Sequence, residues 1–97
     1  MHARVVHVQI RGDKLDEATR LFQETVIPAM KQQQGNRGGY LLTDRTTGKG
    51  LSVSLWESEA AMTASESSGY LQEQLAKFKD LFAQQPTAEH YEVSAQT

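Results

Sequence analysis

The stretch LSVSLWES, residues 51–58, decides the fold prediction, because it alternates apolar and small polar residues up to the only tryptophan of the chain. Successive side chains of a strand point to opposite faces of a sheet, so the aliphatic residues lie on one face and the polar ones, with Trp56, on the other. The first set is Leu51, Val53 and Leu55, and the second is Ser52, Ser54 and Trp56. We expect the aliphatic set to pack beneath helices, which sends the serines and Trp56 to the opposite face.

The segments around this strand predict a complete small fold. Apolar patterns of period two or 3.6 predict strands over residues 4–10, 40–44 and 88–93 and helices over 15–29, 58–64 and 70–82. The sequence SESSG interrupts the last two helical stretches, and Pro28 is expected to end or kink the first helix. The order strand, helix, strand, strand, helix, strand is typical of an α+β, ferredoxin-like βαββαβ fold, a four-stranded antiparallel sheet with its helices on one face.

The other face of this sheet has no helix to cover it. On the strand over residues 4–10, the side chains of Val6, Val8 and Ile10 point to the helices. The open sheet face then carries Val5, His7 and Gln9, together with the serines and tryptophan of the 51–56 strand. Such a mixture of aromatic, aliphatic and small polar groups favours a pocket or a subunit interface.

Length and composition narrow the functional class. The 97 residues predict a single domain over 1–97, and the absence of cysteine excludes a disulfide framework and a thiolate nucleophile. The net charge of −2 is spread along the chain, which argues against a nucleic-acid partner. No apolar run approaches the roughly 18 residues that a membrane helix needs, so we expect a cytoplasmic protein with no membrane partner.

The sequences TGKGLSVSLWESEAAMTASE and GNRGGYLLTDR, with the βαββαβ order, resemble the antibiotic biosynthesis monooxygenase (ABM) domain family, which has the dimeric α+β barrel fold. The resemblance implies a homodimer formed through the open sheet faces, with a pocket between sheet and helices or near the interface. It also implies functions that differ between members: oxygenation of aromatic polyketides without metal or flavin, haem degradation, or no assigned activity. In several members the tryptophan that matches Trp56 lines the pocket.

On the basis of this resemblance we predict a cofactor-independent monooxygenase acting on an aromatic or quinonoid small molecule, with no metal. His7 is the candidate base, since the unperturbed histidine pKa of about 6.5 lies near neutral pH, and Trp56 is the candidate pocket wall. The candidate substrate-binding residues are Ser52, Ser54, Gln9, Tyr40 and Tyr91. The alternative is a non-catalytic dimer of the same fold that binds a small ligand or a partner.

Three further functions are disfavoured. The haem-degrading branch of the family uses an asparagine on the first strand and a histidine on the second helix, whereas the only asparagine here is Asn36 and no histidine falls in that helix. RNA recognition motifs share the topology but stack bases on aromatic side chains, where this chain has Leu51 and Val53. A metal site is disfavoured because His2 and His7 point to opposite faces of one strand.

Overall fold

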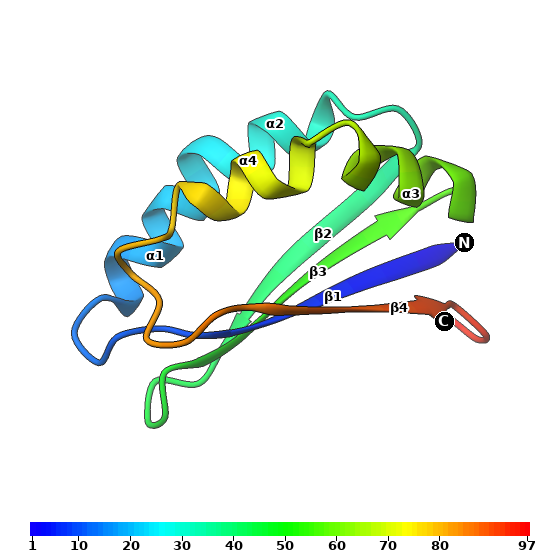
Figure 1. Cartoon of the computed structure of the whole chain (residues 1–97). Helices are drawn as coiled ribbons and strands as arrows, with labels where there is room; N and C mark the ends of the chain where they lie inside the picture. Colours follow the sequence, from blue (N-terminus) through cyan, green and yellow to red (C-terminus); the bar gives the residue numbers. More distant parts are fainter.

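The computed structural model, which describes all residues from 1 to 97, is a four-stranded antiparallel sheet with helices on one face (Figure 1). The sheet order is β2-β3-β1-β4, which confirms the predicted α+β ferredoxin-like fold. The elements in chain order are β1 (His2–Gln9), α1 (Leu15–Leu21), η1 (Phe22–Val26), α2 (Ile27–Lys31), β2 (Asn36–Thr43), β3 (Lys49–Trp56), α3 (Glu59–Ser67), α4 (Tyr70–Ala76) and β4 (Thr87–Glu92).

The first helical stretch is longer than predicted and has an irregular centre. Elements α1, η1 and α2 follow one another without a gap, and η1 is a π-helical segment. Pro28 does not end the helix: it lies in the first turn of α2, where a missing N–H is tolerated. The irregularity instead falls in the turn directly before the proline, as is common where a helix accommodates a local mismatch.

The predicted orientation of β3 is wrong. Strand β3 pairs with β1 so that Ser52 lies opposite Val6, and Ser54 lies opposite Arg4. Directly paired residues of an antiparallel sheet project to the same face, and Val6 is on the helix face, as predicted. The serines and Trp56 therefore face the helices, while Leu51, Val53 and Leu55 face away from them.

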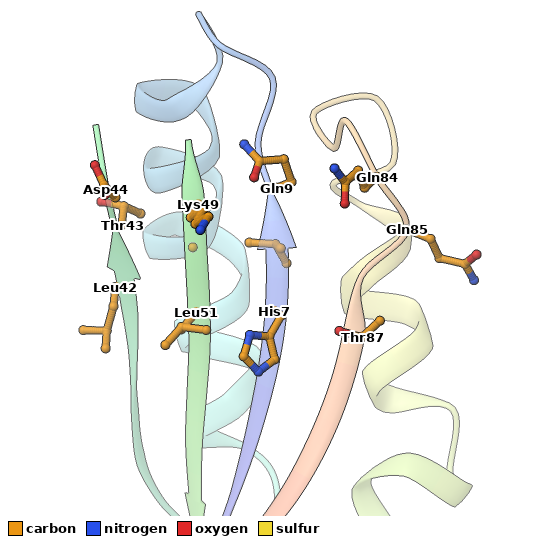
Figure 2. Close-up of a pocket in the computed structure, with 12 residues that line it drawn as sticks. His7, Gln9, Leu42, Thr43, Asp44, Lys49, Leu51, Gln84, Gln85 and Thr87 are labelled. Atoms are coloured by element: carbon orange, nitrogen blue, oxygen red, sulfur yellow. The ribbon is translucent and has the colours of Figure 1, made fainter. Parts of the chain in front are cut away.

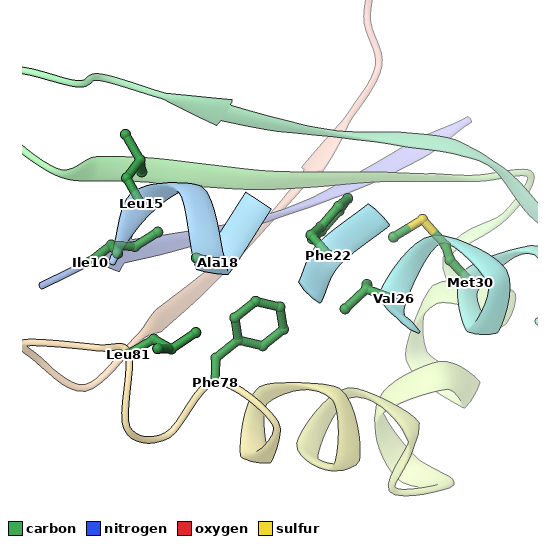
Figure 3. Close-up of a cluster of buried hydrophobic side chains, with 8 residues drawn as sticks. All are labelled: Ile10, Leu15, Ala18, Phe22, Val26, Met30, Phe78 and Leu81. Carbon is green, nitrogen blue, oxygen red and sulfur yellow. The ribbon is translucent and has the colours of Figure 1, made fainter. Parts of the chain in front are cut away.

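The main hydrophobic core lies between the sheet and the helices, toward the end where β1 leads into α1 (Figure 3). It is formed by Ile10, Leu15, Ala18, Phe22, Val26, Met30, Phe78 and Leu81. A second cluster of Trp56, Met62 and Tyr70 is separate from it. Small serines on β3 leave room under the helices between these two clusters, and this room becomes the site described below.

The last predicted helix is shorter than expected, since α4 ends at Ala76 rather than near Phe82. Beyond α4 the chain continues in tight turns, in which backbone N–H groups donate to carbonyls three residues back, as from Phe78 to Leu75. These turns bring Phe78 into the core, and Phe82 forms a β-bridge with Ile10. The start of α3 is as predicted: the Ser58 hydroxyl accepts from the Ala61 N–H at 3.1 Å.

The sheet face opposite the helices, which we call the open face, is strongly apolar at its centre. Its side chains are Val5, His7 and Gln9 of β1, Leu51, Val53 and Leu55 of β3, Tyr40 and Leu42 of β2, and Thr87, Glu89 and Tyr91 of β4. Tyr40, Leu42 and Tyr91 are each at least half exposed. The chain exposes 6187 Å², above the roughly 5,500 Å² expected for a compact monomer of this mass.

Candidate functional site

A narrow cavity, which we call the helix-side cavity, lies between the helices and the strands β1, β2 and β3. Its walls are mainly apolar and come from both layers, from Val6 and Val8 beneath to Leu71 and Leu75 of α4 above. The volume is about 50 Å³, room for one or two water molecules. The polar residues that line it are Arg4, Ser52, Ser54, Tyr70 and Gln74.

Arg4 is the charged residue of this cavity, and it is only 2% exposed. Its Nη1 donates to Ser65 Oγ at 2.7 Å, to Glu66 Oε2 at 3.1 Å and to the Met62 carbonyl at 3.5 Å. All three contacts use the same nitrogen, so Nη2 and Nε have no hydrogen-bond partner in the protein. Because a guanidinium presents five N–H donors in a fixed plane, Arg4 retains donors for a further acceptor.

Glu66 connects Arg4 to the protein surface. Its Oε2 accepts from Arg4 and also lies 2.7 Å from His90 Nε2. His90 of β4 reaches this position because it is directly paired with Arg4 of β1. Arg4 therefore has one carboxylate partner, Glu66, and the half-exposed His90 contacts the same carboxylate oxygen.

Trp56 is completely buried beside Arg4. The Arg4 guanidinium lies 5.3 Å from the centre of the indole ring, within the range of a cation–π contact. The indole Nε1 donates to Ser54 Oγ at 2.9 Å. Since Trp56 contacts two cavity residues without lining the cavity itself, it supports the site rather than forming its exposed wall.

Tyr70, the first residue of α4, has a hydroxyl with no hydrogen-bond partner. The residue is 8% exposed and lines the helix-side cavity. Burial raises the pKa of the Tyr70 phenol above its ordinary value, and the positive charge of Arg4 partly opposes that rise. A buried hydroxyl without a partner is unfavourable, and the Tyr70 hydroxyl is therefore available for a further hydrogen bond.

A second, wider hollow of about 560 Å³ lies on the open face (Figure 2). His7, Leu42, Leu51 and Thr87 lie side by side across four strands in this view, with Gln9 and Lys49 farther along β1 and β3. His7 Nε2 is in close contact with Glu89 Oε1, and both side chains are about half exposed. Desolvation and the adjacent Glu89 carboxylate raise the pKa of Tyr91 on the same face.

The sheet separates the residues that the sequence grouped together. Ser52 and Ser54 line the helix-side cavity, with Trp56 behind them. The remaining candidates, His7, Gln9, Tyr40 and Tyr91, all lie on the open face. Within one subunit, therefore, His7 and Trp56 do not share a pocket.

Sequence reasoning missed three of the five polar residues of the helix-side cavity, which are Arg4, Tyr70 and Gln74. Arg4 is in phase with Val6, Val8 and Ile10, the residues predicted to face the helices. A charged residue on a strand face that is otherwise apolar is rarely buried without a partner, and this was the signal available. Tyr70 and Gln74 lie on the same helical stripe as Leu71 and were not considered as polar candidates.

No group of three or more His, Cys, Asp or Glu side chains is arranged to hold a metal ion. None of the helices has the length and apolar character required to cross a membrane.

An α+β sandwich with a cavity between sheet and helices defines the general class, and comparison with known proteins gives the family. The chain belongs to the antibiotic biosynthesis monooxygenase family, whose model matches residues 1–77. Among curated proteins, an uncharacterised protein of Mycobacterium tuberculosis strain H37Rv is 29% identical over 99 residues, 98% of this chain. The chain spans only 42% of the length of that relative.

Solved structures show the same fold at low sequence identity. A variant of SnoaB, a cofactor-independent oxygenase from Streptomyces nogalater, superimposes with a TM-score of 0.78 at 14% identity, covering 98% of this chain and 94% of SnoaB. Rv0793 from Mycobacterium tuberculosis gives a TM-score of 0.75 at 16% identity, covering 98% and 96% of the two chains. A Nitrosomonas europaea protein of unknown function gives 0.79 at 14% identity, covering 99% and 91%.

Proposed function

We propose that the protein binds a small aromatic or quinonoid molecule in the helix-side cavity and oxygenates it with O₂, without metal or flavin. The observation that carries this proposal is the cavity itself, an apolar space that contains an unpaired Tyr70 hydroxyl and free Arg4 donors. Ligand sites typically combine apolar walls with a few converging polar groups. The likeness to the SnoaB fold is consistent with the chemistry and does not by itself assign it.

The reaction suited to such a site is oxygenation of a carbanion. A substrate such as an anthrone enters as the anion, in which the ring CH⁻ carbon gives one electron to O₂. The two radicals combine into a peroxide at that carbon. The C–H bond then breaks, its electron pair forms the C=O bond as the O–O bond breaks, and the proton and the terminal oxygen leave as hydroxide. The balance is Ar₂CH⁻ + O₂ → Ar₂C=O + OH⁻, so no further oxidant or reductant is needed. The protein would hold the anion and exclude water from the radical pair.

Entry of a ring compound requires the cavity to widen, because ligand pockets usually enclose about 300–1,000 Å³ and this one encloses about 50 Å³. Helix α4 forms one wall of this cavity, through Tyr70, Leu71, Gln74 and Leu75. Gly69, directly before α4, has a φ of 88° and open space where a side chain would lie. We propose that α4 turns outward about Gly69 to admit the ligand.

Oxygen consumption with a panel of anthrones tests the function. Ser52→Leu fills the helix-side cavity and is expected to abolish uptake, whereas His7→Ala abolishes it only if the reaction takes place in the open-face hollow. Uptake that survives Ser52→Leu and disappears in His7→Ala would move the reaction to the open face. Circular dichroism of both variants controls for folding.

A non-catalytic role as a ligand-binding protein is the second candidate. The helix-side cavity is lined by no His, Asp or Glu, and Tyr70, whose pKa is raised, stays protonated at neutral pH and so cannot accept the substrate proton. The cavity therefore offers no group that would deprotonate a substrate arriving in neutral form. Saturable binding of an anthrone without oxygen consumption or product would favour this candidate.

We further propose that two copies of the chain associate through their open faces into the barrel that the family resemblance implies. The support comes from the apolar centre of this face, since exposed apolar patches of this kind mark interaction surfaces, and a sheet face can meet its own copy about a twofold axis. Association would also enclose the hollow around His7. Sedimentation should give a mass twice the 10.8 kDa of one chain.

A further inference from the structure

The polar groups of the helix-side cavity restrict which ligands it can bind. Arg4 presents Nη2 and Nε without partners, and the Tyr70 hydroxyl is also unpaired. Ser54 Oγ already accepts from Trp56, so its own hydrogen remains available to donate. All of these groups can donate a hydrogen bond, and one carries a permanent positive charge.

We infer that the ligand of the helix-side cavity carries an acidic oxygen, a carboxylate or a phenolate, which Arg4 and Tyr70 bind together. This inference rests on the proposed function for the location of the site and adds the chemical class of the ligand. A negatively charged oxygen accepts several hydrogen bonds at once, and such bonds are shorter and stronger than neutral ones. A ligand that offers only donors would leave the Nη2 and Nε groups of Arg4 unsatisfied.

The charged groups next to Arg4 occupy only one of its nitrogens, so an anion can bind to the others. Glu66 neutralises Arg4 through Nη1 alone, and His90 contacts the same carboxylate oxygen. The other edge of the guanidinium, with Nη2 and Nε, makes no hydrogen bond within the protein. An anionic oxygen at this edge would accept from both nitrogens, and the guanidinium lies over the Trp56 ring.

Trp56 also provides the measurement. As the only tryptophan, 5.3 Å from the Arg4 guanidinium, it reports local binding through its fluorescence. Benzoate and its neutral counterpart benzamide have nearly the same shape and differ in charge. A third probe, 4-nitrophenol, shows its ionisation directly by absorbance and distinguishes phenolates from carboxylates as the class that is bound.

The wild-type protein should bind benzoate or 4-nitrophenolate at least about tenfold more tightly than benzamide, since a hydrogen bond to a charged group contributes about 1.5–3 kcal/mol. Binding of benzoate alone indicates carboxylates, and binding of 4-nitrophenolate alone indicates phenolates; either supports the inference. Bound 4-nitrophenol should also ionise at a lower pH than in free solution.

Two variants test whether Tyr70 and Arg4 bind the anion. Tyr70→Phe removes only the unpaired hydroxyl and should weaken anion binding several-fold. Arg4→Lys keeps the charge but loses the planar fork, and should weaken it about tenfold or more. Arg37→Lys is the matched control, because Arg37 forms an exposed pair with Glu57 and lies outside the cavity.

The outcomes separate the inference from the proposed function. Benzamide binding as tightly as benzoate, or anion binding unchanged in both Tyr70→Phe and Arg4→Lys, would overturn the acidic oxygen while leaving a cavity that binds aromatic molecules. If none of the three probes binds, both the inference and the helix-side location are wrong.

Discussion

The two faces of the sheet differ in how their side chains are arranged. The helix side has small serines and a buried Arg4 beneath a layer of apolar helix residues, which leaves a narrow cavity. The open face has aliphatic residues in the centre and a half-exposed pair of His7 and Glu89. One face is built around an interior space, and the other presents a surface suited to a second molecule.

The charge pairs on the two faces differ in how far they are buried. The side chain of Arg4 is 3% exposed and that of its partner Glu66 is 24% exposed, whereas His7 and Glu89 are near 50%. Burial strengthens electrostatic interactions and makes an unpaired charge costly. Changes at Arg4 should therefore have much larger consequences than changes at exposed pairs.

The largest expected effect is on the open face. Val53→Asp places a carboxylate at the centre of the apolar surface, and a twofold axis would bring two such charges together. We expect dissociation of the dimer to monomers of 10.8 kDa, with the dissociation constant raised at least about a hundredfold. Sedimentation equilibrium measures this, and Gln23→Glu on the exposed helix surface is the control. A wild-type protein that is already monomeric would contradict the proposed dimer.

The next effect concerns the buried pair. Arg4→Met leaves Glu66 with only His90 as a partner and removes the cation–π contact with Trp56. The free energy of unfolding, measured in urea, should fall by about 3 kcal/mol. The matched change Arg37→Met, at an exposed pair with Glu57, should cost no more than about 1 kcal/mol. Equal costs for the two variants would show that burial does not increase the contribution of the Arg4–Glu66 pair.

The smallest expected effect is a gain in stability. Tyr70→Phe removes a buried hydroxyl that has no partner in the empty cavity, so the free energy of unfolding should rise by about 1 kcal/mol. A loss of stability would reveal a hydrogen bond that the structure does not show.

The same variant, Tyr70→Phe, should also change how stability depends on pH. Burial raises the folded-state pKa of Tyr70 above the ordinary tyrosine value of about 10, so above that pH the unfolded chain loses this proton more readily than the folded one. Wild-type stability should therefore fall as the pH rises beyond 10, and the fall should be shallower in Tyr70→Phe. Tyr40→Phe, on the exposed β2 strand, serves as the control.

The sequence predicted the element order and the sheet because each strand and helix carries its own periodicity. It failed on the orientation of β3, because the prediction assumed that aliphatic residues must face the helices. That assumption fails when both faces of a sheet are covered, one by helices and the other by the proposed second subunit. Pairing with β1 decides the orientation: Arg4 lies opposite Ser54, and no local pattern in β3 contains that information.

The candidate site was predictable only in part. Ser52 and Ser54 line the helix-side cavity and Trp56 lies behind them, but the sequence combined all three with His7, which is on the opposite face. The partnership of Arg4 with Glu66 spans 62 residues of sequence, so it arises from the packing of α3 on the sheet. Likewise, the unpaired Tyr70 hydroxyl depends on what surrounds it in the fold.

The most direct test of the division between the two faces is a ¹⁵N–¹H NMR titration of the wild-type protein with benzoate and 4-nitrophenolate. The single indole resonance of Trp56 and the backbone amides of Arg4, Ser54 and Tyr70 should shift on binding. The amides of His7, Leu51 and Thr87 should remain in place. Shifts centred on His7, Leu51 and Thr87, with the Trp56 indole unchanged, would place the ligand on the open face and contradict the central claim.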